Sequence, residues 1–171
     1  MAITYTLIAS YTVGSGGVAY VEFASIPNTY TNLVLRSSSR DTSTIAANDG
    51  TLTVNGSNAN FSRTYYSTAP NGNTSDNQAN NNIIYSNTST NTASFFSNQE
   101  IMISDYAKNH FKSFSADIVT TNESASVGWS LIWLSMIWND TSAITTLRMT
   151  PAGASINYAE HTTFYLYGLA N

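Results

Sequence analysis

Two alternations of apolar and polar residues near the end of the chain decide the fold: Ile144-Thr145-Thr146-Leu147-Arg148-Met149 and Thr163-Phe164-Tyr165-Leu166-Tyr167-Gly168-Leu169. A period of two is typical of a strand with one buried face. Pro151 and Gly153 stand between the two alternations and indicate a turn. We therefore expect the chain to close with a pair of strands, the second of which is held inside a sheet rather than left as a tail.

The rest of the chain repeats this pattern in short segments separated by Gly, Asn and Pro, and no window has the apolar spacing of a helix. The sequence predicts an all-β protein whose two antiparallel sheets form a β-sandwich. Its 171 residues suit a single domain, 1–171. Gly14-Ser15-Gly16-Gly17 predicts a hairpin turn. Residues 68–93, rich in Asn, Ser and Thr, predict a long polar loop with one short strand, either merely exposed or a contact tip.

Residues 128–138 are the most apolar part of the chain, and a strand formed by them would carry apolar side chains on both of its faces. A strand that is apolar on both faces has to be covered on both. Either a neighbouring subunit covers the second face, or the segment Ile83-Ile84-Tyr85 of the same chain does. The candidate contacts to a subunit or partner are Trp129, Trp133, Met136, Trp138, Ile83, Ile84 and Tyr85. Trp129 and Trp133 are expected on one face, with Leu131 and Ile137; Met136 and Trp138 on the other, with Ile132 and Leu134.

Composition excludes several classes of protein. The chain has no cysteine, so it can form neither disulfides nor a thiolate metal site. Charged residues make up 9%, the net charge is −4, and six Lys and Arg are scattered without a basic stripe, so no nucleic-acid partner is expected. No apolar run reaches transmembrane length and no leader pattern precedes the first strand, so we expect no membrane partner and synthesis in a cytoplasm.

No arrangement typical of catalysis is found. His110 and His161 lack the spacing of metal ligands, and neither a nucleophile elbow nor a phosphate-binding loop occurs. We predict a protein that is not an enzyme, with no catalytic residues, no cofactor and no metal site, although Asp49 or Asp140 could join a simple cation site. Ten acidic residues leave a hydrolase with paired carboxylates as the remaining enzymatic alternative.

The end of the chain resembles a family of small virion proteins of tailed phages that infect cyanobacteria and other marine bacteria. The resemblance lies in Trp138, Asn139, Thr141, Ala143, Ile144, Gly153 and Leu166-Tyr167-Gly168, and in residues 26–35, 54–62 and 105–109. It covers most of the chain except the residues near 70–95. The resemblance implies a jelly roll, assembly as a homotrimer, and a location in the virion after synthesis in the host cytoplasm.

The same resemblance implies two functions: a capsid decoration or cement protein that contacts the major capsid protein or another virion protein, or the head of a tail or capsid fibre that binds a host-surface glycan. A fibre head usually follows a long shaft, whereas the strand pattern here starts at Tyr5. We therefore expect a decoration protein first and a fibre head second.

Overall fold

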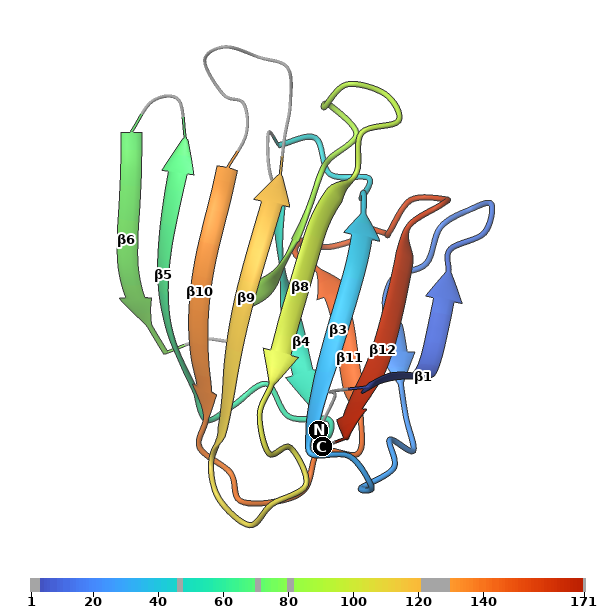
Figure 1. Ribbon diagram of the computed structural model, residues 1–171. Coiled ribbons are helices and arrows are strands. Elements are labelled where there is room, and N and C mark those ends of the chain that lie inside the picture. The colour runs from blue at the N-terminus through green and yellow to red at the C-terminus, as the bar shows by residue number, and fades with distance from the viewer. Residues whose placement is uncertain (1–3, 46–47, 70–71, 80–81, 121–129, 171) are drawn as a thin grey trace.

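The structure is a computed structural model, which describes residues 4–45, 48–69, 72–79, 82–120 and 130–170. In these ranges the chain forms twelve strands and no helix. All strand pairs are antiparallel, and the strands make one eight-stranded and one four-stranded sheet (Figure 1). The prediction of an all-β, two-sheet antiparallel sandwich is confirmed.

The large sheet has the order β1 (Thr4–Thr12), β12 (Thr163–Ala170), β3 (Asn32–Ser39), β8 (Ser97–Ile103), β9 (Lys112–Thr120), β10 (Ser130–Trp138), β5 (Phe61–Ala69) and β6 (Gly72–Gln78). The small sheet has the order β2 (Val21–Phe23), β11 (Leu147–Pro151), β4 (Asn48–Val54) and β7 (Asn82–Ser86). The small sheet lies behind the β3 and β12 part of the large sheet, and β5 and β6 extend beyond it on the left of Figure 1.

Eight of the strands pair in a nested manner. β1 pairs with β12, β2 with β11, β3 with β8 and β4 with β7. This is a long hairpin rolled into two sheets, the connectivity of a jelly roll. The other four strands, β5, β6, β9 and β10, continue the large sheet past β8. They widen the large sheet without adding to the small one.

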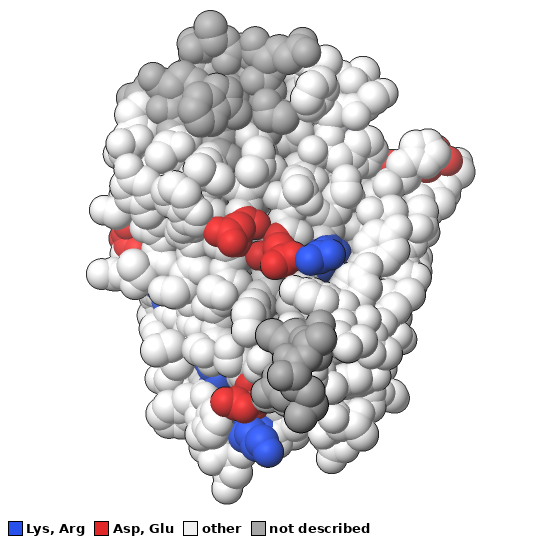
Figure 2. Space-filling view, viewed as in Figure 1, with Lys and Arg blue, Asp and Glu red and all other residues white. Residues whose placement is uncertain are grey.

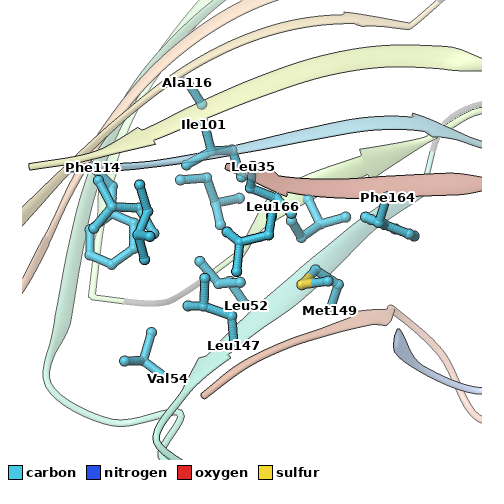
Figure 3. Close-up of a cluster of buried hydrophobic side chains, with 14 of the residues drawn as sticks. Leu35, Leu52, Val54, Ile101, Phe114, Ala116, Leu147, Met149, Phe164 and Leu166 are labelled. Carbon is cyan, nitrogen blue, oxygen red and sulfur yellow. The ribbon is translucent and has the colours of Figure 1, made fainter. Parts of the chain in front are cut away.

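The core lies between the inner faces of the two sheets. Strand β9 shows the reason most clearly, since its residues alternate between buried and exposed along its whole length. Side chains of the large sheet, such as Leu35, Ile101 and Leu166, point toward Leu52 and Leu147 of the small sheet (Figure 3). The alternation read from the sequence therefore places one apolar face of each sheet against the other.

The free edge of β7 is held by side chains of β8 rather than by another strand. The amide of Gln99, which is buried, donates from Nε2 to the Ile83 carbonyl (2.5 Å) and accepts at Oε1 from the Tyr85 N–H (3.1 Å). The Ser97 hydroxyl donates to the Tyr85 carbonyl (2.9 Å). The two sheets are therefore joined at this edge by hydrogen bonds that satisfy buried backbone groups.

Three details of the predicted strand arrangement are wrong. Residues 14–17 do form a turn, with the Gly17 N–H donating to the Gly14 carbonyl (3.2 Å), but it is not a hairpin, because β1 and β2 belong to different sheets. The strand predicted at 144–149 is β11, which begins only at Leu147 and runs to Pro151. β11 and β12 belong to opposite sheets instead of pairing with each other, while β12 does lie inside its sheet between β1 and β3. In both cases the turn was predicted correctly, but the sequence of a turn does not reveal whether the strands before and after it pair with each other.

The third correction concerns residues 68–93, which were expected to be mostly loop. Strands β6 and β7 occupy much of this segment, and β5 extends into it to Ala69. β6 has an almost wholly exposed burial pattern, so it needs no apolar residues, and its backbone is held by pairing with β5. The Asn-rich composition therefore reflects an edge strand that is exposed to solvent on both faces, not an unpaired loop.

Candidate binding surface

Strand β10 has the two faces that the sequence predicted. Ile132, Leu134, Met136 and Trp138 are buried on the inner face, with exposed fractions of 4% or less. On the outer face Trp133 is 48% exposed and Ile137 46%. The apolar outer face is therefore open in this chain.

Most of the predicted contact residues do not lie on that face. Met136 and Trp138 belong to the core, as do Ile83 and Ile84 of β7. Tyr85 is half-buried, and its hydroxyl accepts from the Arg63 guanidinium (3.4 Å). Ile83-Ile84-Tyr85 therefore does not cover Trp133, and burial removes Met136, Trp138, Ile83 and Ile84 from any contact surface of this fold. Trp129 lies outside the described residues.

Trp133 is part of a row of directly paired residues that crosses the outer face of the large sheet. The registers of six strands place side by side, in this order, Tyr66 of β5, Trp133 of β10, Asp117 of β9, Glu100 of β8, Arg36 of β3 and Tyr165 of β12. Figure 2 shows the centre of this row as two acidic side chains beside one basic side chain. We call these six residues the outer row.

Aromatic rings lie at both ends of the outer row. The Trp133 and Tyr66 rings stack, with centroids 5.9 Å apart and planes at 14°. At the other end Tyr165 stacks on Tyr167 with centroids 6.4 Å apart. Tyr66 is 39% exposed and Tyr165 37%. Each end of the row therefore presents a partly exposed aromatic surface.

The charged centre of the row is only partly paired. Arg36 Nε lies 2.6 Å from Glu100 Oε2, and this hydrogen bond raises the pKa of the Arg36 guanidinium. The Arg36 guanidinium also lies 5.1 Å from the Tyr5 ring centroid and 5.7 Å from that of Tyr167, which is within the range of cation–π attraction. Asp117 is exposed and makes no hydrogen bond or ion pair with any other described residue.

Two open hollows flank Asp117. One, of about 420 Å³, is lined by residues that include Tyr66, Ser75, Ser115, Asp117, Trp133 and Ser135. The other, of about 480 Å³, is lined by Arg36, Asn98, Gln99, Glu100, Asp117 and Val119. Together they form a continuous surface in which aromatic rings adjoin carboxylates, a guanidinium, hydroxyls and an amide. Such a surface can hold a ligand by stacking and by hydrogen bonds at the same time.

Two buried charged groups have structural partners and are not candidate sites. Lys112 Nζ donates to the carbonyls of Lys108 (2.7 Å) and His110 (2.5 Å), and burial lowers the pKa of this amine. The Asp41 carboxylate accepts from Asn48 Nδ2 (2.8 Å) and the Ser43 N–H (2.9 Å), and burial raises its pKa. Both groups fasten loops to the sandwich.

Within the described ranges, no three His, Cys, Asp or Glu side chains come close enough together to hold a metal ion. No helix long and apolar enough to cross a membrane occurs there either.

The outer row was not among the predicted site residues, apart from Trp133. Alternation in β9 and β10 does place Asp117 and Trp133 on outward-facing positions. Their grouping with Glu100 and Arg36 depends on the register between strands that lie far apart in the sequence, which no local pattern reveals.

Comparisons of the chain with protein-family models, with curated proteins and with solved structures found no match.

Proposed function

We propose that this chain is a structural protein of a phage particle, of the capsid decoration kind, which acts by binding and not by catalysis. The observation that carries the proposal is the nested pairing of eight strands. A jelly roll is the architecture of many viral capsid domains and of lectin domains. It agrees with the resemblance to small virion proteins in residues 138–168. Because fold alone does not fix function, the surface has to supply the rest of the argument.

The proposed decoration protein assembles as a homotrimer through the outer face of β10, and we place this contact at Ile137. This side chain is 46% exposed and adjoins a hollow of about 440 Å³ lined mainly by neutral residues, among them Ser62, Thr64, Asn77, Gln78 and Ser135. Burying the remaining half of an isoleucine is worth about 1 kcal/mol per subunit. Uncharged neighbours can be desolvated at lower cost than ions, which suits a contact between subunits.

Sedimentation equilibrium of the purified protein tests the assembly, with three chains expected at micromolar concentration. The variant Ile137→Asp is expected to sediment as a folded monomer, because it places a carboxylate in the contact. Ser113→Asp, which adds the same charge at the outward position paired with Ile137 on β9, measures how far the contact extends. A mass of one chain for the unmodified protein would exclude the trimer.

The location on the particle needs a separate experiment. Antibodies against the protein, viewed on phage particles by negative-stain microscopy, are expected to label the head. Label on the tail or on fibres would favour the second candidate, and absence of label on intact particles would contradict a place on the virion surface.

The second candidate function is a fibre head that binds host-surface carbohydrate. The outer row favours it, because its aromatic rings and charged side chains share one open surface. Jelly rolls occur among lectin domains as well as among capsid domains. A decoration protein with such a row would carry both properties.

A further inference from the structure

We infer that the outer row binds a neutral oligosaccharide laid across the strands of the large sheet. This inference rests on the second candidate function and specifies its ligand and its site. The site is the row Tyr66, Trp133, Asp117, Glu100, Arg36 and Tyr165, together with the two hollows on either side of Asp117.

The aromatic ends of the row set the length of the ligand. Trp133 and Tyr165 stand on strands separated by four strand spacings, which corresponds to about 19 Å. The C–H faces of sugar rings are apolar and flat, so they pack on exposed aromatic rings and remove apolar area from water. A single sugar can reach only one end of the row, whereas a short oligosaccharide reaches both. Binding is therefore expected to increase with chain length.

The centre of the row supplies the hydrogen bonds that sugar hydroxyls need. Asp117 offers two carboxylate oxygens without a partner in the described chain, and Glu100 has oxygen capacity beyond its bond to Arg36. Hydroxyl groups that donate to a carboxylate form short, charge-assisted bonds, which are stronger than neutral ones. Asn98 on one side and Ser115 on the other can both donate and accept.

The charges of the row favour a neutral sugar over an acidic one. Two carboxylates against one guanidinium leave this part of the surface negative, and the whole chain carries −4 (Figure 2). An acidic polysaccharide would be repelled by Asp117.

A second copy of the chain is also a poor occupant of the row, because it has few cations to offer Asp117. Five of its six Lys and Arg are buried, hydrogen-bonded or ion-paired within the fold, namely Arg36, Arg40, Arg63, Lys112 and Arg148. A contact at Ile137, about 13 Å along β10 from Trp133, leaves the row accessible.

Intrinsic tryptophan emission and titration calorimetry of the full chain test the inference. The probes are the monosaccharides, disaccharides and hexasaccharides of the cello, manno, xylo and malto series, with polygalacturonate as the acidic probe. Trp133 is exposed and Trp138 is buried, so bound sugar is expected to change the emission of Trp133. We expect at least one neutral hexasaccharide to bind ten-fold or more tightly than its disaccharide, and polygalacturonate not to bind.

Variants then assign the binding to the row. Asp117→Asn keeps the shape of the side chain and removes the charge, and it is expected to weaken binding roughly ten-fold or more. Trp133→Ala is expected to abolish the emission change, and calorimetry should show a similar loss of affinity. Phe111→Ala, which removes an exposed aromatic ring outside both the row and the proposed subunit contact, should bind as the unmodified protein does.

Three results would overturn the inference: no neutral hexasaccharide binds at millimolar concentration, Asp117→Asn and Trp133→Ala bind unchanged, or Trp133→Ala lowers the sedimented mass. The last result would show that a second copy, not a sugar, occupies the row. The mass of the unmodified protein and the position of the antibody label are measured without any sugar. Failure of the sugar site is therefore distinguishable from failure of the proposed virion function.

Discussion

Replacing Gln99 by methionine should strongly weaken the joint between the two sheets. Methionine has nearly the same length as glutamine but neither donor nor acceptor of comparable strength. The Ile83 carbonyl and the Tyr85 N–H would both lose their partner at the free edge of β7, in a place where Gln99 is only 2% exposed. A buried backbone group left without a partner costs about 1–3 kcal/mol. With two such groups and a small gain from the apolar side chain, we expect a loss of roughly 2–4 kcal/mol.

Urea unfolding followed by circular dichroism measures this loss. For a slope of about 2 kcal/mol per molar urea, the midpoint should fall by roughly 1–2 M with the slope unchanged. Asn98→Met is the matched control, because Asn98 is the preceding residue of β8 and its side chain is exposed; its effect should stay within about 0.5 kcal/mol. Hydrogen exchange of the Tyr85 amide should become faster in Gln99→Met alone. A midpoint equal to that of the control would refute the view that this amide holds β7.

Three further predictions concern buried groups. Burial raises the pKa of Tyr85, Tyr106 and, most strongly, Tyr158, so these phenols stay neutral in the folded protein. Their contribution to the free energy of unfolding is complete below pH 10, the ordinary tyrosine pKa, and is lost as the pH rises further. A tyrosinate absorption titration should therefore show their ionisation coinciding with unfolding. The Tyr158 hydroxyl is buried with no hydrogen-bond partner, so Tyr158→Phe should change the free energy of unfolding at neutral pH by less than about 1 kcal/mol. The same variant should move alkaline unfolding to higher pH, whereas the exposed control Tyr5→Phe should not, and an unchanged alkaline midpoint would contradict this. Gly168→Ala should destabilise the protein by about 1–3 kcal/mol in the urea assay, because the added methyl would overlap the Tyr30 ring, whereas Gly14→Ala, which has open space, should be nearly neutral; equal midpoints for the two variants would argue against close packing at Gly168.

The sequence was sufficient to predict the class of fold because burial alternates along the strands. β9 and β10 each place one apolar face inward, and this can be read from one strand at a time. The same signal predicted correctly that Trp133 and Ile137 share a face opposite Met136. It did not reveal which of the two faces belongs to the core, because both faces of β10 are apolar and the neighbouring strands decide which one is buried.

Strand partners and edge strands could not be read in this way. The turn at residues 14–17 carries the chain between sheets, yet a hairpin would use the same glycines. The polar strand β6 has no buried face to produce a pattern, so its Asn and Ser residues resembled a loop. The outer row combines both difficulties, since Arg36 and Asp117 meet only through the registers of β3, β8 and β9. Pairing of distant segments, not local preference, creates that surface.

The nested pairing of the strands also determines the order in which the fold can close. Among the four nested pairs, β4 and β7 are the nearest in sequence, followed by β3 and β8, then β2 and β11, and β1 and β12 are the most distant. Because closing a longer loop costs more chain entropy, assembly is expected to start at the middle of the chain and proceed toward its two ends. β1 then remains unpaired until the last step, and it carries the exposed apolar side chains Tyr5, Leu7 and Tyr11. An unpaired strand with such side chains is the part of the chain most prone to aggregation during folding.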